Sequence, residues 1–103
     1  MEIAMPTFMC FLNWTDQGAR NAKDANKRFQ ASRSLAEKLG GKLLTAYVTT
    51  GRYDVALTLD MPNGDAMAKF ASAIAGSGNA RTTTVRAYTP DEFSKLVAEA
   101  PTM

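Results

Sequence analysis

The stretch Thr7-Phe8-Met9-Cys10-Phe11-Leu12-Asn13-Trp14 decides the fold. Its side chains are apolar or aromatic in both alternating sets: Phe8, Cys10, Leu12 and Trp14 in one, and Met9 and Phe11 with Asn13 in the other. Alternate side chains of a strand point to opposite faces of its sheet. The pattern therefore predicts a strand that is covered on both faces and ends at Thr15-Asp16, where a helix cap fits.

The segment after this strand has a helical pattern from Asp16 to Leu39. One face of it carries mostly apolar residues at helical spacing, namely Ala25, Phe29, Ser32, Leu35, Ala36 and Leu39. Gly18 and the segment from Asn21 to Asn26 weaken the beginning of this helix, so we expect a kink or a broken first turn there. Gly40-Gly41 ends the helix, because glycine tolerates the left-handed backbone at a helix terminus.

The second half of the chain continues with two strands, a helix, a strand and a short helix. Residues 42–50 and 53–59 alternate as strands and predict a hairpin across Gly51-Arg52. An amphipathic helix with Met67, Phe70, Ala71 and Ile74 follows and ends at residues 76–79. Residues 81–88 form the last strand, and Thr89-Pro90-Asp91-Glu92 caps a short helix through Val97.

This order predicts an α+β fold of the ferredoxin-like βαββαβ kind: a four-stranded antiparallel sheet, two helices on one face, and an extra short C-terminal helix. We expect a single domain over residues 1–103, with residues 1–5 disordered or a start extension and residues 90–103 a short helix and tail. The face without helices carries apolar side chains of the first strand. We therefore expect a homodimer in which two sheet faces pack together, a dimeric α/β barrel, with higher oligomers left open.

Composition removes several classes of chemistry. The chain has 103 residues, 12 Lys+Arg against 10 Asp+Glu, one cysteine and no histidine. A Ser-His-Asp or Cys-His nucleophile, a histidine-held zinc and a proximal-histidine haem are excluded, and we expect no cofactor and no metal. One cysteine, no secretory signal and no long apolar run lead us to expect a cytoplasmic protein that binds no membrane. The basic residues of the first helix are interpreted as a solvated face, with no nucleic acid as partner.

Four stretches in order resemble the GYD-domain family of small bacterial proteins, which is named for its Gly-x-Tyr-Asp motif. They are Met5-Pro6-Thr7-Phe8, residues 12–18 (Leu-Asn-Trp-Thr-Asp-Gln-Gly), Gly51-Arg52-Tyr53-Asp54, and residues 79–88 (Asn-Ala-Arg-Thr-Thr-Thr-Val-Arg-Ala-Tyr). The resemblance covers nearly the whole chain. It implies a dimeric α/β barrel of the ferredoxin-like kind and little about chemistry, since members of the family are mostly uncharacterised.

Tyr53 and Asp54 are the candidate catalytic residues. At the start of a strand near a cavity mouth, this pair would orient a ligand carbonyl or abstract a proton, provided that burial raises the pKa of the aspartate. The structural interpretation is that Gly51 supplies a positive φ, Tyr53 packs, and Asp54 caps the turn or pairs with an arginine. Both interpretations stay open at this stage.

The candidate ligand-binding residues are Asn13, Trp14, Arg52, Thr82, Thr84 and Arg86. Arg86 would hold a carboxylate or phosphate, with Thr82 and Thr84 as hydroxyl donors, although Asp54 is an equally good internal partner for Arg86. Asn13 needs polar partners if it is buried, and Trp14 is an aromatic platform or a core residue. Cofactor-independent monooxygenases of the same dimeric-barrel architecture hold aromatic substrates with these residue types, which is an analogy of fold.

Two functions follow from these patterns. In the first, a cytoplasmic homodimer binds a small aromatic or carboxylate-bearing molecule in a barrel cavity, and cofactor-independent catalysis there stays open. In the second, the chain is a non-enzymatic interaction or accessory module that recognises a protein through its basic helix or the end near Gly51-Arg52.

Overall fold

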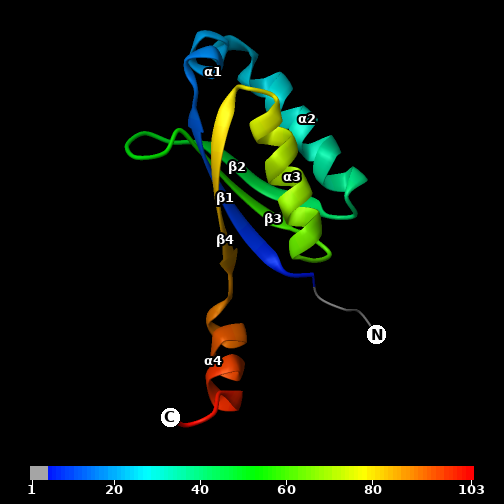
Figure 1. The fold of residues 1–103 in the computed structure, drawn as a ribbon, viewed down its shortest axis with the longest axis vertical. Helices are drawn as coiled ribbons and strands as arrows, with labels where there is room; N and C mark the ends of the chain where they lie inside the picture. The colour runs from blue at the N-terminus through cyan, green and yellow to red at the C-terminus, as the bar shows by residue number, and fades with distance from the viewer. Residues whose placement is uncertain (1–4) are drawn as a thin grey trace.

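The computed structural model describes residues 5–103, so the expected start extension falls outside the described residues except for Met5. Its centre is a four-stranded antiparallel sheet with the order β2-β3-β1-β4. The strands are β1 (Thr7–Trp14), β2 (Lys42–Val48), β3 (Val55–Asp60) and β4 (Ala80–Ala87). The predicted ferredoxin-like order is confirmed. Within one chain the sheet is open (Figure 1).

Strand β1 lies between two neighbours along its whole length. Phe8 lies opposite Leu59 on β3 and Arg86 on β4, and Leu12 lies opposite Val55 and Thr82. The two central strands are buried on the face that carries Phe8, Cys10 and Leu12. The apolar alternation of β1 therefore places one set of side chains in the core and leaves Met9 and Phe11 on the opposite face.

The first helical segment is three pieces, α1 (Asp16–Arg20), the 3₁₀ helix η1 (Ala22–Asp24) and α2 (Ala25–Lys38). The expected break near residues 21–26 is confirmed. Thr15 caps α1 by accepting the Gly18 N–H at 3.2 Å. Helices α2 and α3 (Gly64–Gly76) lie on the same face of the sheet (Figure 1).

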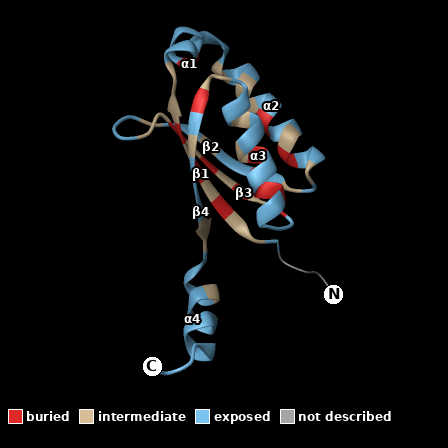
Figure 2. Ribbon diagram, in the orientation of Figure 1, coloured by how far each residue is buried: buried red, intermediate tan, exposed pale blue. Residues whose placement is uncertain are grey.

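The core lies between these two helices and the sheet. Phe70 of α3 is fully buried, as are Leu57 and Leu59 of β3, Cys10 of β1 and Met61. Figure 2 shows buried residues on β1, β3, α2 and α3. Burial of these large side chains supplies most of the hydrophobic stabilisation.

The hairpin between β2 and β3 is looser than the sequence predicts. Strand β2 ends at Val48 and β3 starts at Val55, so residues 49–54 form a loop that projects from the sheet (Figure 1). Gly51 has φ +106°, as expected for this position. The strands end early because the polar groups next to them bond elsewhere. The Thr49 hydroxyl donates to the Tyr53 carbonyl within the loop, and Asp54 bonds to Leu12 and Trp14 of β1.

The face opposite the helices, which we call the open face, is lined by side chains of all four strands. Tyr47 on β2 and Val85 on β4 are 64% and 45% exposed. Met9 and Phe11 of β1 lie between them on the same face. Helices α2 and α3 lie on the other side of the sheet (Figure 1), so neither covers this apolar strip.

Helix α4 (Pro90–Glu99) projects beyond the end of β4 and has no buried residue (Figure 2). Thr89 and Glu92 form a reciprocal capping box, in which each side chain accepts the backbone N–H of the other. The hydrogen bond from the Thr89 N–H lowers the pKa of Glu92. The predicted short C-terminal helix is confirmed. Across residues 5–103, no helix combines the length and apolar character that crossing a membrane requires.

Candidate functional site

Asp54 ties the β2–β3 loop to the end of β1. Its carboxylate accepts the Trp14 N–H at 2.8 Å, and its own N–H donates to the Leu12 carbonyl at 2.9 Å. The ladder between β1 and β3 stops at the pair Leu12 and Val55. The carboxylate of Asp54 therefore takes the place of the next carbonyl of β3 as the acceptor for β1. These contacts agree with the interpretation in which Asp54 has a structural role in the turn.

The side chains near Asp54 also make contacts within this loop or between it and β1. Asn13 donates from Nδ2 to the Arg52 carbonyl at 2.7 Å. The Tyr53 ring stacks on Phe11, with ring centroids 4.8 Å apart and planes inclined by 27°. The Arg52 guanidinium lies 5.9 Å from the centroid of the Tyr53 ring. The Tyr53 ring thus lies on the open face and extends its apolar strip, and the exposed Arg52 lies beside that ring.

Replacing Asp54 with alanine should cost about 1–3 kcal/mol of stability, because the half-buried Trp14 N–H loses its acceptor. Asparagine keeps an acceptor oxygen, so Asp54→Asn should retain most of the stability. Urea unfolding followed by Trp14 fluorescence measures both variants. Equal losses for alanine and asparagine would show that the negative charge matters, and that the acceptor alone is insufficient.

Arg86 lies at the other end of β1. It donates from Nη1 to the Thr7 carbonyl at 3.0 Å and to the Ala87 carbonyl. Its guanidinium lies 4.2 Å from the Tyr88 ring centroid and 5.8 Å from that of Phe8. The distance along β1 from Phe8 to Trp14 is roughly 20 Å at about 3.3 Å per residue. Arg86 and Asp54 are therefore not partners.

Thr82 and Thr84 lie on β4 opposite Leu12 and Cys10. The Thr84 hydroxyl donates to the Cys10 sulfur at 3.7 Å. Burial raises the pKa of the Cys10 thiol, and the Thr84 hydrogen bond opposes that shift only in part. The thiol is thus held in its neutral form, which is a poor nucleophile.

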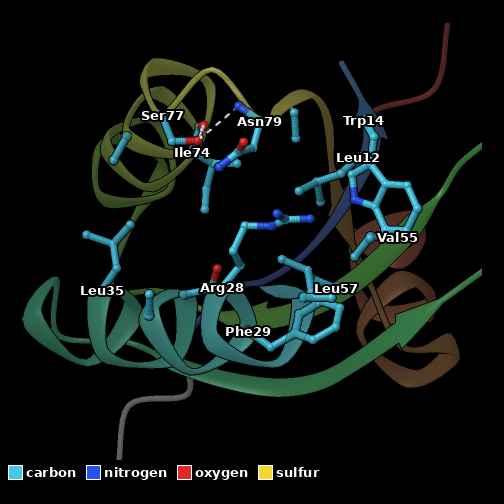
Figure 3. A pocket seen from close by; sticks show the side chains of 15 residues that line it. Leu12, Trp14, Arg28, Phe29, Leu35, Val55, Leu57, Ile74, Ser77 and Asn79 are labelled. Carbon is cyan, nitrogen blue, oxygen red and sulfur yellow. Dashed lines mark hydrogen bonds between the residues drawn. The ribbon is translucent and has the colours of Figure 1, made fainter. Parts of the chain in front are cut away.

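A mostly apolar cavity lies elsewhere, between α2, α3 and the helix-covered face of the sheet (Figure 3). Its volume is about 220 Å³, and its lining is mostly apolar, with Leu12, Phe29, Leu35, Val55 and Ile74 among the residues. Of the predicted site residues, Trp14 lines it. Asn13, Arg52, Tyr53, Asp54, Thr82, Thr84 and Arg86 do not.

Arg28 is the single charged residue among those that line the cavity. Its side chain extends from α2 into the space (Figure 3), where Nη1 donates to the Asn21 carbonyl at 2.8 Å and Nη2 to the Gly18 carbonyl at 3.3 Å. A guanidinium has five N–H donors, so donors remain for a ligand. Its remaining polar neighbours in the lining are Ser32, Ser77 and Asn79.

Arg28 is thus a cavity residue that the sequence does not single out, because it stands among the basic residues of a helix face that we interpret as solvated. A signal was present, because Arg28 follows Ala25 by three residues and precedes Ser32 by four, which places it on the apolar side of α2.

The loop after α3 fixes the Trp14 end of the cavity. The Thr15 N–H donates to the Asn79 carbonyl at 3.1 Å, and the Thr15 hydroxyl donates to the Gly78 carbonyl at 2.6 Å. Gln17 donates to the side chain of Asn79 at 3.0 Å. Residues of two of the four stretches quoted above, 12–18 and 79–88, therefore meet here.

Comparison with known proteins gives one match to a protein family. The sequence model of the GYD domain matches residues 8–97, which span β1 to most of α4. A search of curated proteins finds no match. Because the family match covers nearly the whole chain and the folded core, this protein belongs to the GYD-domain family.

Proposed function

We propose that the cavity between α2, α3 and the sheet binds a small molecule with an apolar body and a carboxylate. The observation that carries this proposal is one guanidinium, Arg28, inside an otherwise uncharged and mostly apolar lining. In such surroundings a charge-assisted hydrogen bond is stronger than in water. A planar guanidinium also matches the two oxygens of a carboxylate.

The size of the cavity limits the ligand. At about 220 Å³ it is smaller than the roughly 300–1,000 Å³ typical of sites for drug-sized molecules. A compact acid with a single aromatic ring suits this volume. Leu12, Phe29 and Ile74 supply apolar contacts for its body, and Trp14 supplies an aromatic face.

The lining favours binding over catalysis. Among the residues that line the cavity, none is an aspartate, glutamate, lysine, cysteine or tyrosine, and the chain has no histidine. General acid–base catalysis needs such a group within hydrogen-bond reach of the substrate. Tyr53 and Asp54, the candidate catalytic pair, lie outside the cavity. We therefore propose a carrier or sensor role for the chain.

The test is a fluorescence titration. Trp14 is the only tryptophan and lines the cavity, so its emission reports occupancy directly. Benzoate and phenylacetate are titrated at pH 7, each beside its primary amide as an uncharged match. The acids should bind and the amides should bind more weakly.

Arg28→Gln should lower the affinity for the acids about 10–100-fold. This is the loss expected when a hydrogen bond to a charged group, worth roughly 1.5–3 kcal/mol, is removed. It should leave the weaker affinity for the amides unchanged, which shows that the cavity is intact. Lys27→Gln removes the same charge from an exposed neighbour and is the matched control. Equal binding of acid and amide, or wild-type affinity in Arg28→Gln, would contradict the proposal.

We also propose that the protein is a homodimer formed through the open face. The exposed Tyr47 and Val85, with Phe11 between them, support this arrangement, because apolar strips of this kind are typical of interaction sites. Sedimentation equilibrium at micromolar concentration should give twice the chain mass, and Tyr47→Asp should shift the equilibrium toward monomer. A wild-type monomer would exclude the homodimer.

A further inference from the structure

Ser32 is a polar residue on the apolar face of α2. It is only 8% exposed, and it is the one buried polar or charged residue among residues 5–103. Its neighbours one turn away on the same face, Arg28, Phe29 and Leu35, line the cavity, as Ser32 itself does. The Ser32 side chain therefore belongs to the middle of the wall that α2 contributes to the cavity.

The Ser32 hydroxyl makes no hydrogen bond within residues 5–103, although a helical serine can donate to a carbonyl one turn earlier. Ser77, at the end of α3, makes such a bond to the Ile74 carbonyl at 2.7 Å. Throughout the same part of the chain, the polar side-chain atoms that protein fully encloses all have hydrogen-bond partners. The Ser32 hydroxyl is therefore not fully enclosed, and the space that it reaches is the cavity.

A free hydroxyl at this position is unfavourable for the folded chain by itself. Buried polar groups are nearly always paired, and leaving one unpaired costs free energy. An alanine would avoid that cost, and the same face of α2 carries alanine at positions 25 and 36. A partner that arrives with a ligand explains the hydroxyl better than the packing of α2 does.

The Ser32 hydroxyl and the Arg28 guanidinium are well separated. Ser32 follows Arg28 by four residues, which is about 6 Å along the axis of α2. The Arg28 side chain runs the other way, because it donates to the carbonyls of Asn21 and Gly18, and α1 lies at the N-terminal end of α2 (Figure 1). A ligand that meets both groups must therefore carry its two polar groups far apart.

The second polar group of such a ligand is best a hydroxyl. Serine offers one donor and an acceptor, and a ligand hydroxyl matches this pair. A second carboxylate would lack a cation, since Arg28 is the single charged residue among those that line the cavity. A phenolic hydroxyl, like that of tyrosine, is neutral at pH 7 and so suits a mostly apolar wall.

We propose that Ser32 selects aromatic acids that carry a hydroxyl group on the far side of the ring from the carboxylate. Arg28 holds the carboxylate, and the Ser32 hydroxyl bonds the ligand hydroxyl. A compact member of this class is 4-hydroxybenzoate. This inference rests on the proposed binding of a carboxylate in the cavity and adds to it the class of ligand.

The experiment is isothermal titration calorimetry at pH 7. It compares 4-hydroxybenzoate with 4-methylbenzoate, which has a methyl group in place of the hydroxyl, and with 2-hydroxybenzoate, whose hydroxyl lies beside the carboxylate. The wild type should bind 4-hydroxybenzoate about 3–10-fold more tightly than either, as expected for one additional neutral hydrogen bond.

Ser32→Ala should remove this preference, while its affinity for 4-methylbenzoate stays at the wild-type value or rises. Ser34→Ala makes the same substitution at an exposed position of α2 and is the matched control. It should keep the full preference for 4-hydroxybenzoate.

A stability measurement without ligand separates this role from a structural one. Because the Ser32 hydroxyl has no partner within residues 5–103, the midpoint of urea unfolding of Ser32→Ala should equal or exceed that of the wild type. A lower midpoint would mean that the hydroxyl supports the fold, and would overturn the proposal.

The titrations also distinguish the failure of this inference from the failure of the proposed function. If the acids bind through Arg28 but the wild type does not prefer 4-hydroxybenzoate, the role of Ser32 is overturned while carboxylate binding stands. The same holds if Ser32→Ala keeps the preference. If no aromatic acid binds the wild type, both proposals are overturned.

Discussion

Gly18→Ala is expected to destabilise the protein by about 3 kcal/mol, at the upper end of what overpacking costs. A Cβ on Gly18 would lie 1.9 Å from the Asn79 carbonyl oxygen and 2.9 Å from its carbon. These are backbone atoms. A glycine is required here because there is no room for a side chain. Backbone conformation is not the reason, since Gly18 is not among the glycines with positive φ in residues 5–103.

The Asn79 backbone has little freedom to move away. Its carbonyl accepts the Thr15 N–H, and the adjacent Gly78 carbonyl accepts the Thr15 hydroxyl. The Gly18 carbonyl in turn accepts from Arg28. The same substitution should therefore also weaken carboxylate binding in the cavity.

Urea unfolding followed by Trp14 fluorescence measures this loss. Gly76→Ala is the control, because a Cβ there meets nothing within 4 Å, and its stability should stay close to wild type. A Gly18→Ala variant within about 0.5 kcal/mol of wild type, the range of ordinary surface changes, would mean that α1 does not pack on the α3–β4 loop as described.

Phe70→Ala should cost about 3–5 kcal/mol, the usual range for removing a buried aromatic side chain from a core. Phe70 is fully buried between α3 and the sheet. Phe70 belongs to the same buried core as Leu57 and Leu59 of β3, a strand that is paired on both sides, so we expect the void left by Phe70 to collapse only in part.

Thermal and urea unfolding of Phe70→Ala and Phe70→Leu test this expectation. The leucine variant leaves a smaller void and should lose less. If alanine costs no more than leucine, the core around Phe70 repacks freely and is not fixed by the sheet.

The fold could be predicted because its signals are local and agree with one another. The two apolar sets of residues 7–14 predicted a central strand, and Asn21 to Asn26 predicted the break between α1 and α2. Thr89 and Glu92 predicted the cap of α4 by their spacing. Each of these features depends on residues within a few positions of one another.

The candidate site depends on pairings that no local pattern contains. Asp54 accepts from Trp14 because β3 leaves the ladder one residue early, and Arg86 lies at the opposite end of β1 because of the β1–β4 register. Their separation could not be read from spacing. Arg28 looked like one more cation of a basic helix, and its place in the cavity depends on how α2 packs beside α3.

The register shift in β2 between Leu43 and Thr45 has a consequence for solubility. Strand β2 is an edge strand, and an unbroken edge offers its free N–H and C=O groups to any other chain in solution. A bulge bends the strand and interrupts that row of donors and acceptors. We therefore expect strand addition to be disfavoured at this edge, although it carries the exposed Leu44, Tyr47 and Val48, and the tendency toward cross-β aggregation to be lower than for an unbroken edge.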